Sequence, residues 1–166
     1  MLRRSKTDAE DRQSAGPARL LVVADDDAAL ELVARLLEQA TYAVERSSEH
    51  AEAVKMLRYG DATYSGVIVD FHGGGTSSSL KLLDAVRHLD DKARSQVPVM
   101  ILTGTDTNRV FAWQSGADAF LVRPFHATEM VDEVHEMLER TDSEREQHRR
   151  EQMKLARSAQ ARRVAE

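Results

Sequence analysis

Four apolar runs stand out along the chain, and each ends on a polar or charged residue. They predict strands over about residues 19–24, 66–70, 97–103 and 119–123. Continuous apolar runs of this length are typical of strands that are buried on both faces, as in a parallel sheet. A further strand, richer in polar residues, is expected over residues 42–47.

Segments with helical character separate the predicted strands. The expected helices cover residues 27–40, 48–59, 79–90 and 106–115, and a last one begins near Thr128. In the first of them, apolar residues recur on one helix face, namely Leu30, Val33, Leu36 and Leu37. Residues that favour helix ends mark several boundaries, namely Asp27, Ser48, Gly60 and either Ser78 or Ser79. This alternation of strands and helices predicts an α/β fold with a doubly wound parallel sheet.

Chemically distinctive residues follow the predicted strands. Asp25 follows the first apolar run, and Asp70, Thr103 and Arg123 end the other three. In open parallel sheets, ligands bind at the carboxyl ends of the strands. We therefore expect two carboxylates, a hydroxyl and a cation to converge on one site, which is suited to a divalent metal ion and a phosphoryl group.

Composition narrows the function classes. The chain has 166 residues, a net charge of −5 and a pI near 5.7, which argues against general nucleic-acid binding. It has no cysteine, so it has no disulfide framework and no zinc–thiolate site. No apolar run approaches the roughly 20 residues of a membrane-spanning helix. A cytoplasmic protein without direct contact with nucleic acid or membrane is expected.

The chain divides into three parts. Residues 1–17 are polar and predict a disordered leader, residues 18–140 form the predicted domain, and residues 141–166 form a charged tail that is helical or disordered. For the tail we favour an extension of the last helix that frays into disorder, because no heptad seam is present. The alternative is a short coiled coil or a partner-binding helix.

Over about residues 18–140 the chain resembles the receiver domain of two-component response regulators. The resemblance rests on Asp25, Asp70, Thr103 and Arg123-Pro124 in order, and on the stretch 116–125, which is similar to the family's sequence around the fifth strand. It implies a flavodoxin-like five-stranded parallel sheet of strand order 2-1-3-4-5 with five helices. In one interpretation the last helix continues into the C-terminal tail.

The resemblance also implies roles for the residues at the strand ends. Asp70 would accept a phosphoryl group from a sensor histidine kinase or a phosphotransfer protein. Asp25, Asp70 and the backbone carbonyl of His72 would hold Mg²⁺, with Asp26 as a further candidate ligand. Thr103 and Arg123 would contact the phosphoryl oxygens. Such a protein is a phosphorelay component rather than an enzyme.

Three departures from the family pattern bear on this site. Ala24 stands where the family has its first acid, which predicts weaker Mg²⁺ binding. Arg123 replaces the usual lysine, and a guanidinium either binds the phosphoryl group in another geometry or locks Asp70 in a salt bridge. The loop 72–79 contains three glycines and is about one residue longer than usual.

The resemblance finally implies an output surface, formed by the fourth helix, the fifth strand and the fifth helix. Thr103 would couple to Phe120, and Trp113 either anchors a partner or packs at the rim of the core. We expect a single-domain response regulator that switches this surface for a downstream protein partner. A homodimer is a further possible assembly. The alternative is a phosphorylation-independent adaptor. An FMN-binding enzyme is discounted, because no Ser/Thr-rich phosphate loop follows the first strand, and the three aspartates over residues 25–27 repel a phosphate in the absence of a metal ion.

Overall fold

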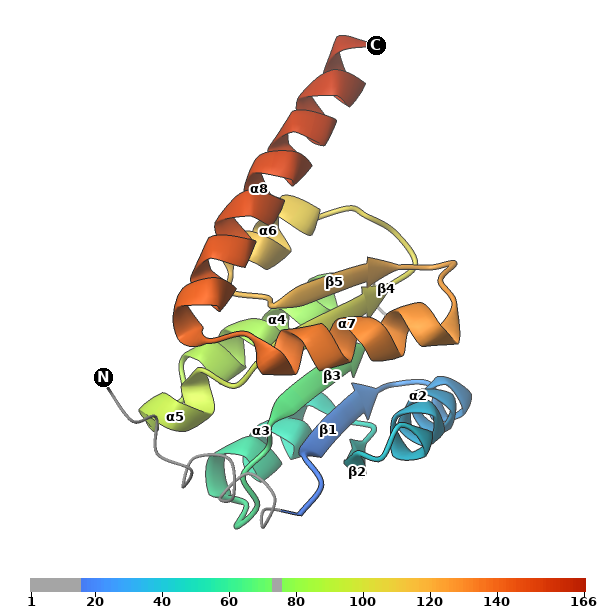
Figure 1. Cartoon of the computed structure of the whole chain (residues 1–166), viewed down its shortest axis with the longest axis vertical. Helices are drawn as coiled ribbons and strands as arrows, with labels where there is room; N and C mark the ends of the chain where they lie inside the picture. Colours follow the sequence, from blue (N-terminus) through green and yellow to red (C-terminus); the bar gives the residue numbers. More distant parts are fainter. Residues whose placement is uncertain (1–15, 73–75) are drawn as a thin grey trace, which may run out of the picture.

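The predicted strands pair side by side in parallel in the computed structural model, which describes residues 16–72 and 76–166 (Figure 1). The sheet has five strands in the order β2-β1-β3-β4-β5, which confirms the flavodoxin-like prediction. The strands are β1 (Arg19–Ala24), β2 (Ala43–Ser47), β3 (Gly66–Asp70), β4 (Val99–Thr103) and β5 (Ala119–Val122). The predicted leader falls mostly outside the described residues.

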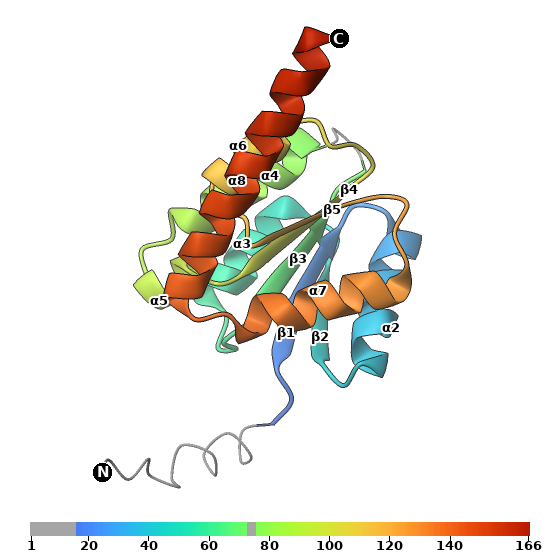
Figure 2. The same ribbon diagram turned by 45° about the horizontal axis from the view of Figure 1, so that its top comes forward.

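Helices cover both faces of the sheet, so the unit has three layers (Figures 1 and 2). The helices are α2 (Asp27–Gln39), α3 (His50–Tyr59), α4 (Thr76–Arg87), α5 (Lys92–Ser95), α6 (Arg109–Gln114), α7 (Ala127–Glu139) and α8 (Asp142–Ala165). Alternate strand residues face opposite layers. Leu20, Val22 and Ile68 pack with α2 and α7, whereas Leu21 and Val67 pack with α3, α4 and α6.

The helix starts differ from the sequence predictions. Asp26, and not Asp27, caps α2, because its Oδ1 accepts a hydrogen bond from the backbone N–H of Ala29 at 2.8 Å. A run of consecutive aspartates offers several possible caps, and the sequence alone does not select among them. Similarly, α3 is preceded by Glu49 rather than by Ser48.

The later boundaries also shift. Helix α4 begins three residues before the expected position, so Ser78 and Ser79 lie within its first turn and do not cap it. Strand β4 begins at Val99, since Val97 closes a turn onto the carbonyl of Arg94 at 3.3 Å. Helix α6 is shorter than predicted because residues 104–108 form a loop.

The C-terminal tail forms a helix of its own, which corrects the favoured prediction. The chain is extended at Arg140 and Thr141, so α7 ends there. A capping box then starts α8: Thr141 Oγ1 accepts from the N–H of Glu144 at 3.2 Å, and Glu144 Oε2 accepts from the N–H of Thr141 at 2.8 Å. The tail is therefore neither a continuation of α7 nor a frayed end, but a second helix of 24 residues.

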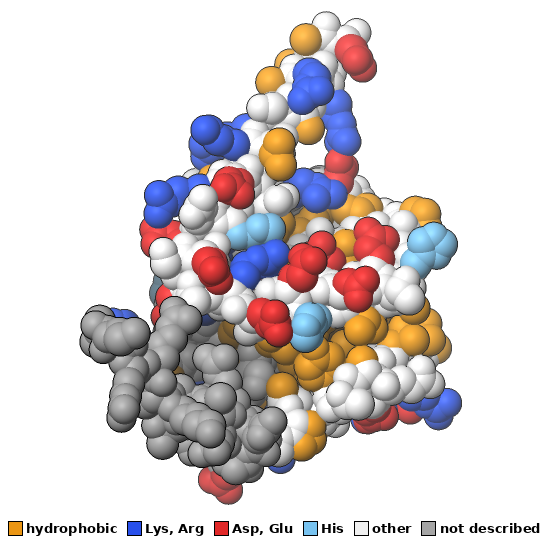
Figure 3. Space-filling view, in the orientation of Figure 1, with side chains coloured by type: hydrophobic (Ala, Val, Ile, Leu, Met, Phe, Trp, Pro, Cys, Tyr) orange, Lys and Arg blue, Asp and Glu red, His pale blue; other side chains and the backbone are white. Residues whose placement is uncertain are grey.

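Charge is distributed unevenly over these two helices. Acidic side chains gather over α7, and basic side chains lie along α8 (Figure 3). Among the helices in the described part of the chain, none is both long enough and apolar enough to cross a membrane.

Candidate functional site

The carboxyl ends of β1, β3, β4 and β5 bring the predicted site residues to one edge of the sheet. Ala24 of β1 lies beside Asp70 of β3, and Thr103 of β4 lies beside Val122 of β5. Asp25 and Arg123 follow these strands directly, so the strand register places all four predicted side chains at the same edge. This confirms the convergence that the apolar runs predict.

Asp70 is the most deeply buried of these residues, with a side chain that is 1% exposed. Its Oδ2 accepts a hydrogen bond from Nη2 of Arg123. Its Oδ1 lies 3.3 Å from Nε2 of His72 but accepts no hydrogen bond from any described residue. A buried carboxylate needs a counter-charge, which Arg123 supplies, and one of its two oxygens is left for another partner.

Arg123 is held on both sides. Its guanidinium lies over the ring of Phe125, with 5.6 Å from Cζ to the ring centroid, while Nη2 meets Asp70. Its backbone N–H donates to the carbonyl of Thr103 at 2.8 Å, which continues the β4–β5 pairing. Arg123 thus forms a salt bridge with Asp70 in this structure.

Asp25 and His72 meet across the strand ends. The backbone N–H of His72 donates to Oδ1 of Asp25 at 2.7 Å, which ties the residue after β3 to the residue after β1. This contact brings the proposed carbonyl ligand and a proposed carboxylate ligand together beside Asp70. Among the described residues, no three Asp, Glu or His side chains are grouped as a metal centre would require.

Asp26, the further candidate ligand, also has a structural role. One of its oxygens caps α2, as described above, so Asp25 remains the better-placed acid of the β1–α2 loop. Ala24 is fully buried and offers no oxygen in its side chain. The donor set that fits Mg²⁺ is therefore two carboxylates and a backbone carbonyl, completed by water.

Thr103 lies at the end of β4 and is 3% exposed. Its Oγ1 accepts a hydrogen bond from the backbone N–H of Thr105 at 3.3 Å. The hydroxyl lies at the same edge as Asp70 and Arg123, as its place after β4 predicts.

Helix α8 covers part of the expected output surface, where it packs on α6. Trp113 is 3% exposed and meets the ring of His148 of α8 edge-on, with centroids 5.5 Å apart. Phe120 is also buried, and the guanidinium of Arg109 lies over its ring at 4.8 Å. Of the two interpretations of Trp113, the structure has the packed one, and the tryptophan is not an exposed anchor for a partner.

A second buried carboxylate, which the sequence analysis did not single out, holds this cover in place. Asp118, which is 2% exposed, accepts hydrogen bonds from Arg87 of α4 and from Arg145 and Arg149 of α8. Burial would raise the pKa of Asp118, but the hydrogen bond from Arg145 and the charges of all three arginines lower it below its ordinary value. The signal in the sequence was two arginines four residues apart, which also fits a solvated helix.

The strand order and the acidic, hydroxyl and cationic residues at the strand ends are those of a receiver-type signalling domain. The profile of the response regulator receiver domain family matches residues 20–135, and the chain belongs to that family. Receiver domains are modules of two-component signalling rather than enzymes.

Known relatives agree with this assignment. The chain is 29% identical over 127 residues to the transcriptional regulatory protein SrrA of Staphylococcus aureus, a match that covers 75% of this chain and 49% of SrrA. It thus spans about half the length of the curated relatives that it matches.

Solved structures show the same fold. A putative response regulator from Chloroflexus aurantiacus is 28% identical, with a TM-score of 0.63, and the match covers 75% of this chain and 99% of that one. The receiver domain of a Pseudomonas aeruginosa sensor histidine kinase is 19% identical, with a TM-score of 0.61 and coverage of 75% and 98%. That structure holds a magnesium ion in its active-site cleft.

Proposed function

We propose that this receiver is a Mg²⁺-dependent phosphoacceptor of cytoplasmic two-component signalling, with Asp70 as the residue that is phosphorylated. Its partners are a sensor histidine kinase or phosphotransfer protein and a downstream protein. The state of Asp70 carries the proposal: Oδ2 is held by Arg123, while the buried Oδ1 accepts no hydrogen bond from the described residues. Such a carboxylate is oriented by one oxygen and able to react through the other.

The transfer itself is mostly a matter of position and charge. Oδ1 of Asp70 attacks the phosphorus of a phosphohistidine, the N–P bond breaks, and its electron pair returns to the partner's imidazole. Arg123 offsets the negative charge that gathers beside Asp70, and the hydroxyl of Thr103 donates to a phosphoryl oxygen. Asp25, Asp70 and the carbonyl of His72 are the residues that would hold Mg²⁺, which supplies further neutralisation of the phosphoryl charge when bound.

A second candidate function is a phosphorylation-independent adaptor with the same fold. The salt bridge between Arg123 and Asp70 favours it, because a buried carboxylate that already has a cationic partner resists losing that partner. Ala24 favours it as well, since it removes one acid from the metal site. In this function the Asp70–Arg123 pair is a fixed structural contact.

Intact-mass measurement with a small phosphodonor separates the two functions. The protein is incubated with acetyl phosphate, with and without Mg²⁺, beside an Asp70→Asn variant. The phosphoacceptor function predicts the added mass of one phosphoryl group in the parent protein, only with Mg²⁺, and none in the variant. If neither acetyl phosphate nor a panel of phosphorylated histidine kinases adds this mass, the adaptor function replaces the proposal.

A further inference from the structure

Helix α8 consists of two parts that are held very differently. Its proximal part, residues 142–156, contains Arg145 and Ala156, both of which are buried. Its distal part, residues 157–165, is exposed at every position. Figures 1 and 2 both show the proximal part against the body of the protein and the C-terminal end projecting beyond it.

The proximal part is fixed to the receiver. Arg145 donates to Oδ1 and Oδ2 of Asp118 at 2.8 and 3.1 Å, and Arg149 donates to Oδ1 at 2.9 Å and to the carbonyl of Ala117 at 3.1 Å. Charge-assisted hydrogen bonds of this kind, out of water, are strong. We therefore regard residues 142–156 as a stable part of the receiver fold.

The distal part has one side-chain hydrogen bond to the rest of the described chain. Nη2 of Arg163 donates to Oδ2 of Asp106 at 2.6 Å, and the two side chains are 68% and 34% exposed. Exposed ion pairs hold weakly, because water competes for both charges. The last turns of α8 are thus poised to leave the surface on which they lie.

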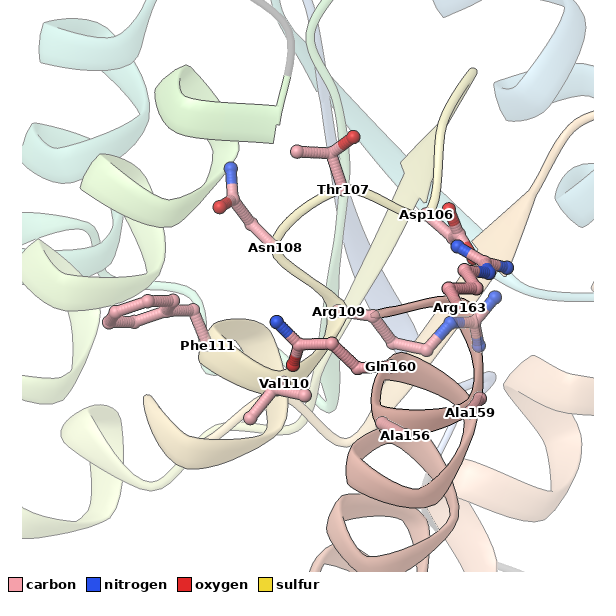
Figure 4. Close-up of a pocket in the computed structure, with 10 residues that line it drawn as sticks. All are labelled: Asp106, Thr107, Asn108, Arg109, Val110, Phe111, Ala156, Ala159, Gln160 and Arg163. Carbon is pink, nitrogen blue, oxygen red and sulfur yellow. The ribbon is translucent and has the colours of Figure 1, made fainter. Parts of the chain in front are cut away.

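This weak contact closes one side of a cavity of about 360 Å³ between α6 and α8. Figure 4 shows Gln160 extending from α8 toward α6, and Arg109 lying close to Arg163 and Asp106. Val110 and Ala156 supply apolar parts of the wall. Without the distal part of α8, this wall would be an open surface on α6 next to the buried Phe120.

The loop that carries Asp106 begins at the proposed phosphorylation site. Thr103 ends β4, and its Oγ1 accepts from the N–H of Thr105. The hydroxyls of Thr105 and Thr107 lie 2.9 Å apart, and the N–H of Thr107 donates to the Thr105 hydroxyl at 3.2 Å. Asp106 lies between these linked threonines, so its backbone is connected to Thr103 through a short, hydrogen-bonded loop.

We propose that residues 157–165 form a releasable cover over the cavity between α6 and α8, which is held by Arg163–Asp106 and released when Asp70 is phosphorylated. The inference rests on the proposed phosphoacceptor function for its trigger. A phosphoryl group on Asp70 places new acceptor oxygens at the edge where Thr103 and Thr105 lie. The hydrogen-bond donors of the loop after β4 turn toward the phosphoryl group, and Asp106 moves with the loop. The distance between Asp106 and Arg163 then increases.

Hydrogen exchange on short labelling times, read by mass spectrometry on the full chain, tests the cover. The variants are Arg163→Gln and a matched control, Arg162→Gln, which removes the same charge from an adjacent residue without a described ion pair. We expect Arg163→Gln to speed exchange of the 157–165 peptide by about two- to fivefold, and Arg162→Gln to leave it unchanged. Exchange over 142–156 should be the same in all three proteins.

The same experiment with Mg²⁺ and beryllofluoride, a mimic of the phosphoryl group, tests whether modification of Asp70 releases the cover. Exchange of the 157–165 peptide in the parent should rise to the level of Arg163→Gln, with no rise in Asp70→Asn. Equal exchange in Arg163→Gln and Arg162→Gln would overturn the cover, and a change over 142–156 would overturn the division into two parts. A response at residues 66–72 without one at 157–165 would overturn the coupling alone.

Failure of the proposed function has a different signature. If residues 66–72 do not respond to beryllofluoride and acetyl phosphate adds no mass, the phosphoacceptor function fails, and release through Asp70 fails with it. The comparison of Arg163→Gln with Arg162→Gln still decides in that case whether the ion pair holds the distal part of α8.

Discussion

Replacement of Arg145 by methionine should destabilise the receiver, because this side chain ties α8 to the buried carboxylate of Asp118. The methionine keeps most of the apolar stem and removes the guanidinium, and with it the bonds to Asp118 and a weaker contact of 3.5 Å to the exposed Asp142. The structure gives Arg145 two hydrogen bonds to this carboxylate, at 2.8 and 3.1 Å, and a side chain that is 8% exposed.

The expected loss follows from these contacts. Hydrogen bonds to charged groups contribute about 1.5–3 kcal/mol each, so the two bonds set an upper range of about 3–6 kcal/mol. Arg149 and Arg87 stay bonded to Asp118, which keeps the carboxylate paired and moves the loss toward about 3 kcal/mol. With a typical urea dependence of about 2 kcal/mol per molar, the unfolding midpoint should fall by about 1.5 M.

Urea unfolding followed by Trp113 fluorescence measures this loss, since the ring lies against His148 of α8. The matched control is Arg150→Met, because Arg150 pairs with Glu146 at 2.9 Å where both side chains are more than two-thirds exposed. That change should stay within about 0.5 kcal/mol. If Arg145→Met shifts the midpoint no more than Arg150→Met does, the bonds from Arg145 to Asp118 do not stabilise the receiver.

Three further predictions concern the site and α7. Replacing Arg123 by lysine should speed phosphorylation by acetyl phosphate about tenfold, because a compact ammonium holds Oδ2 of Asp70 less firmly than the guanidinium does. The rate is read by intact mass, and an unchanged rate would show that the Arg123–Asp70 pair does not restrain Asp70. Ala24→Asp should tighten Mg²⁺ binding about tenfold in calorimetric titration, because it adds a carboxylate around the ligands of the metal ion. An unchanged affinity would show that residue 24 does not interact with the metal site. Burial, and then the charge of Glu136, raise the pKa of Glu133, so this carboxyl opposes folding at pH values above 4.5, where it ionises more readily in the unfolded chain. Glu133→Gln should therefore raise the thermal midpoint at pH 7, with the gain vanishing as the pH falls toward 4.5, the ordinary glutamate value; a gain that is constant with pH would refute the assignment.

The sheet and the edge with the candidate site were predictable, because short stretches of sequence determine both. Each apolar run marks a strand that is buried on both faces, and the residue after it reaches the carboxyl edge whatever the helices do. Asp70, Thr103 and Arg123 are brought together by topology, so no knowledge of side-chain packing was needed. Helix starts were harder, because Asp26 and Asp27 are equivalent caps until the backbone geometry is known.

The role of α8 was not predictable in the same way. Its capping box, Thr141 and Glu144, is a local signal and could have marked a new helix. Its docking cannot be found from periodicity, because charged side chains rather than an apolar stripe fix it to the receiver. Arg145 and Arg149 resemble solvated residues until Asp118, which is 27 residues away from the nearer one, is placed beneath them.

Two of the buried aspartates that the structure describes are paired with arginine. The number of hydrogen-bond donors around each carboxylate distinguishes a structural role from a reactive one. Both oxygens of Asp118 are engaged: three guanidiniums and the N–H of Val99 donate to them. Asp70 has one arginine on Oδ2 and no hydrogen bond from the described residues on Oδ1. A carboxylate saturated with donors gains nothing from a further ligand and serves as an anchor. A carboxylate that is oriented but half satisfied, at the edge where parallel strands end, still has an oxygen with which to bind a cation or attack phosphorus. For this reason we propose Asp70 as the phosphoacceptor and Asp118 as the structural anchor.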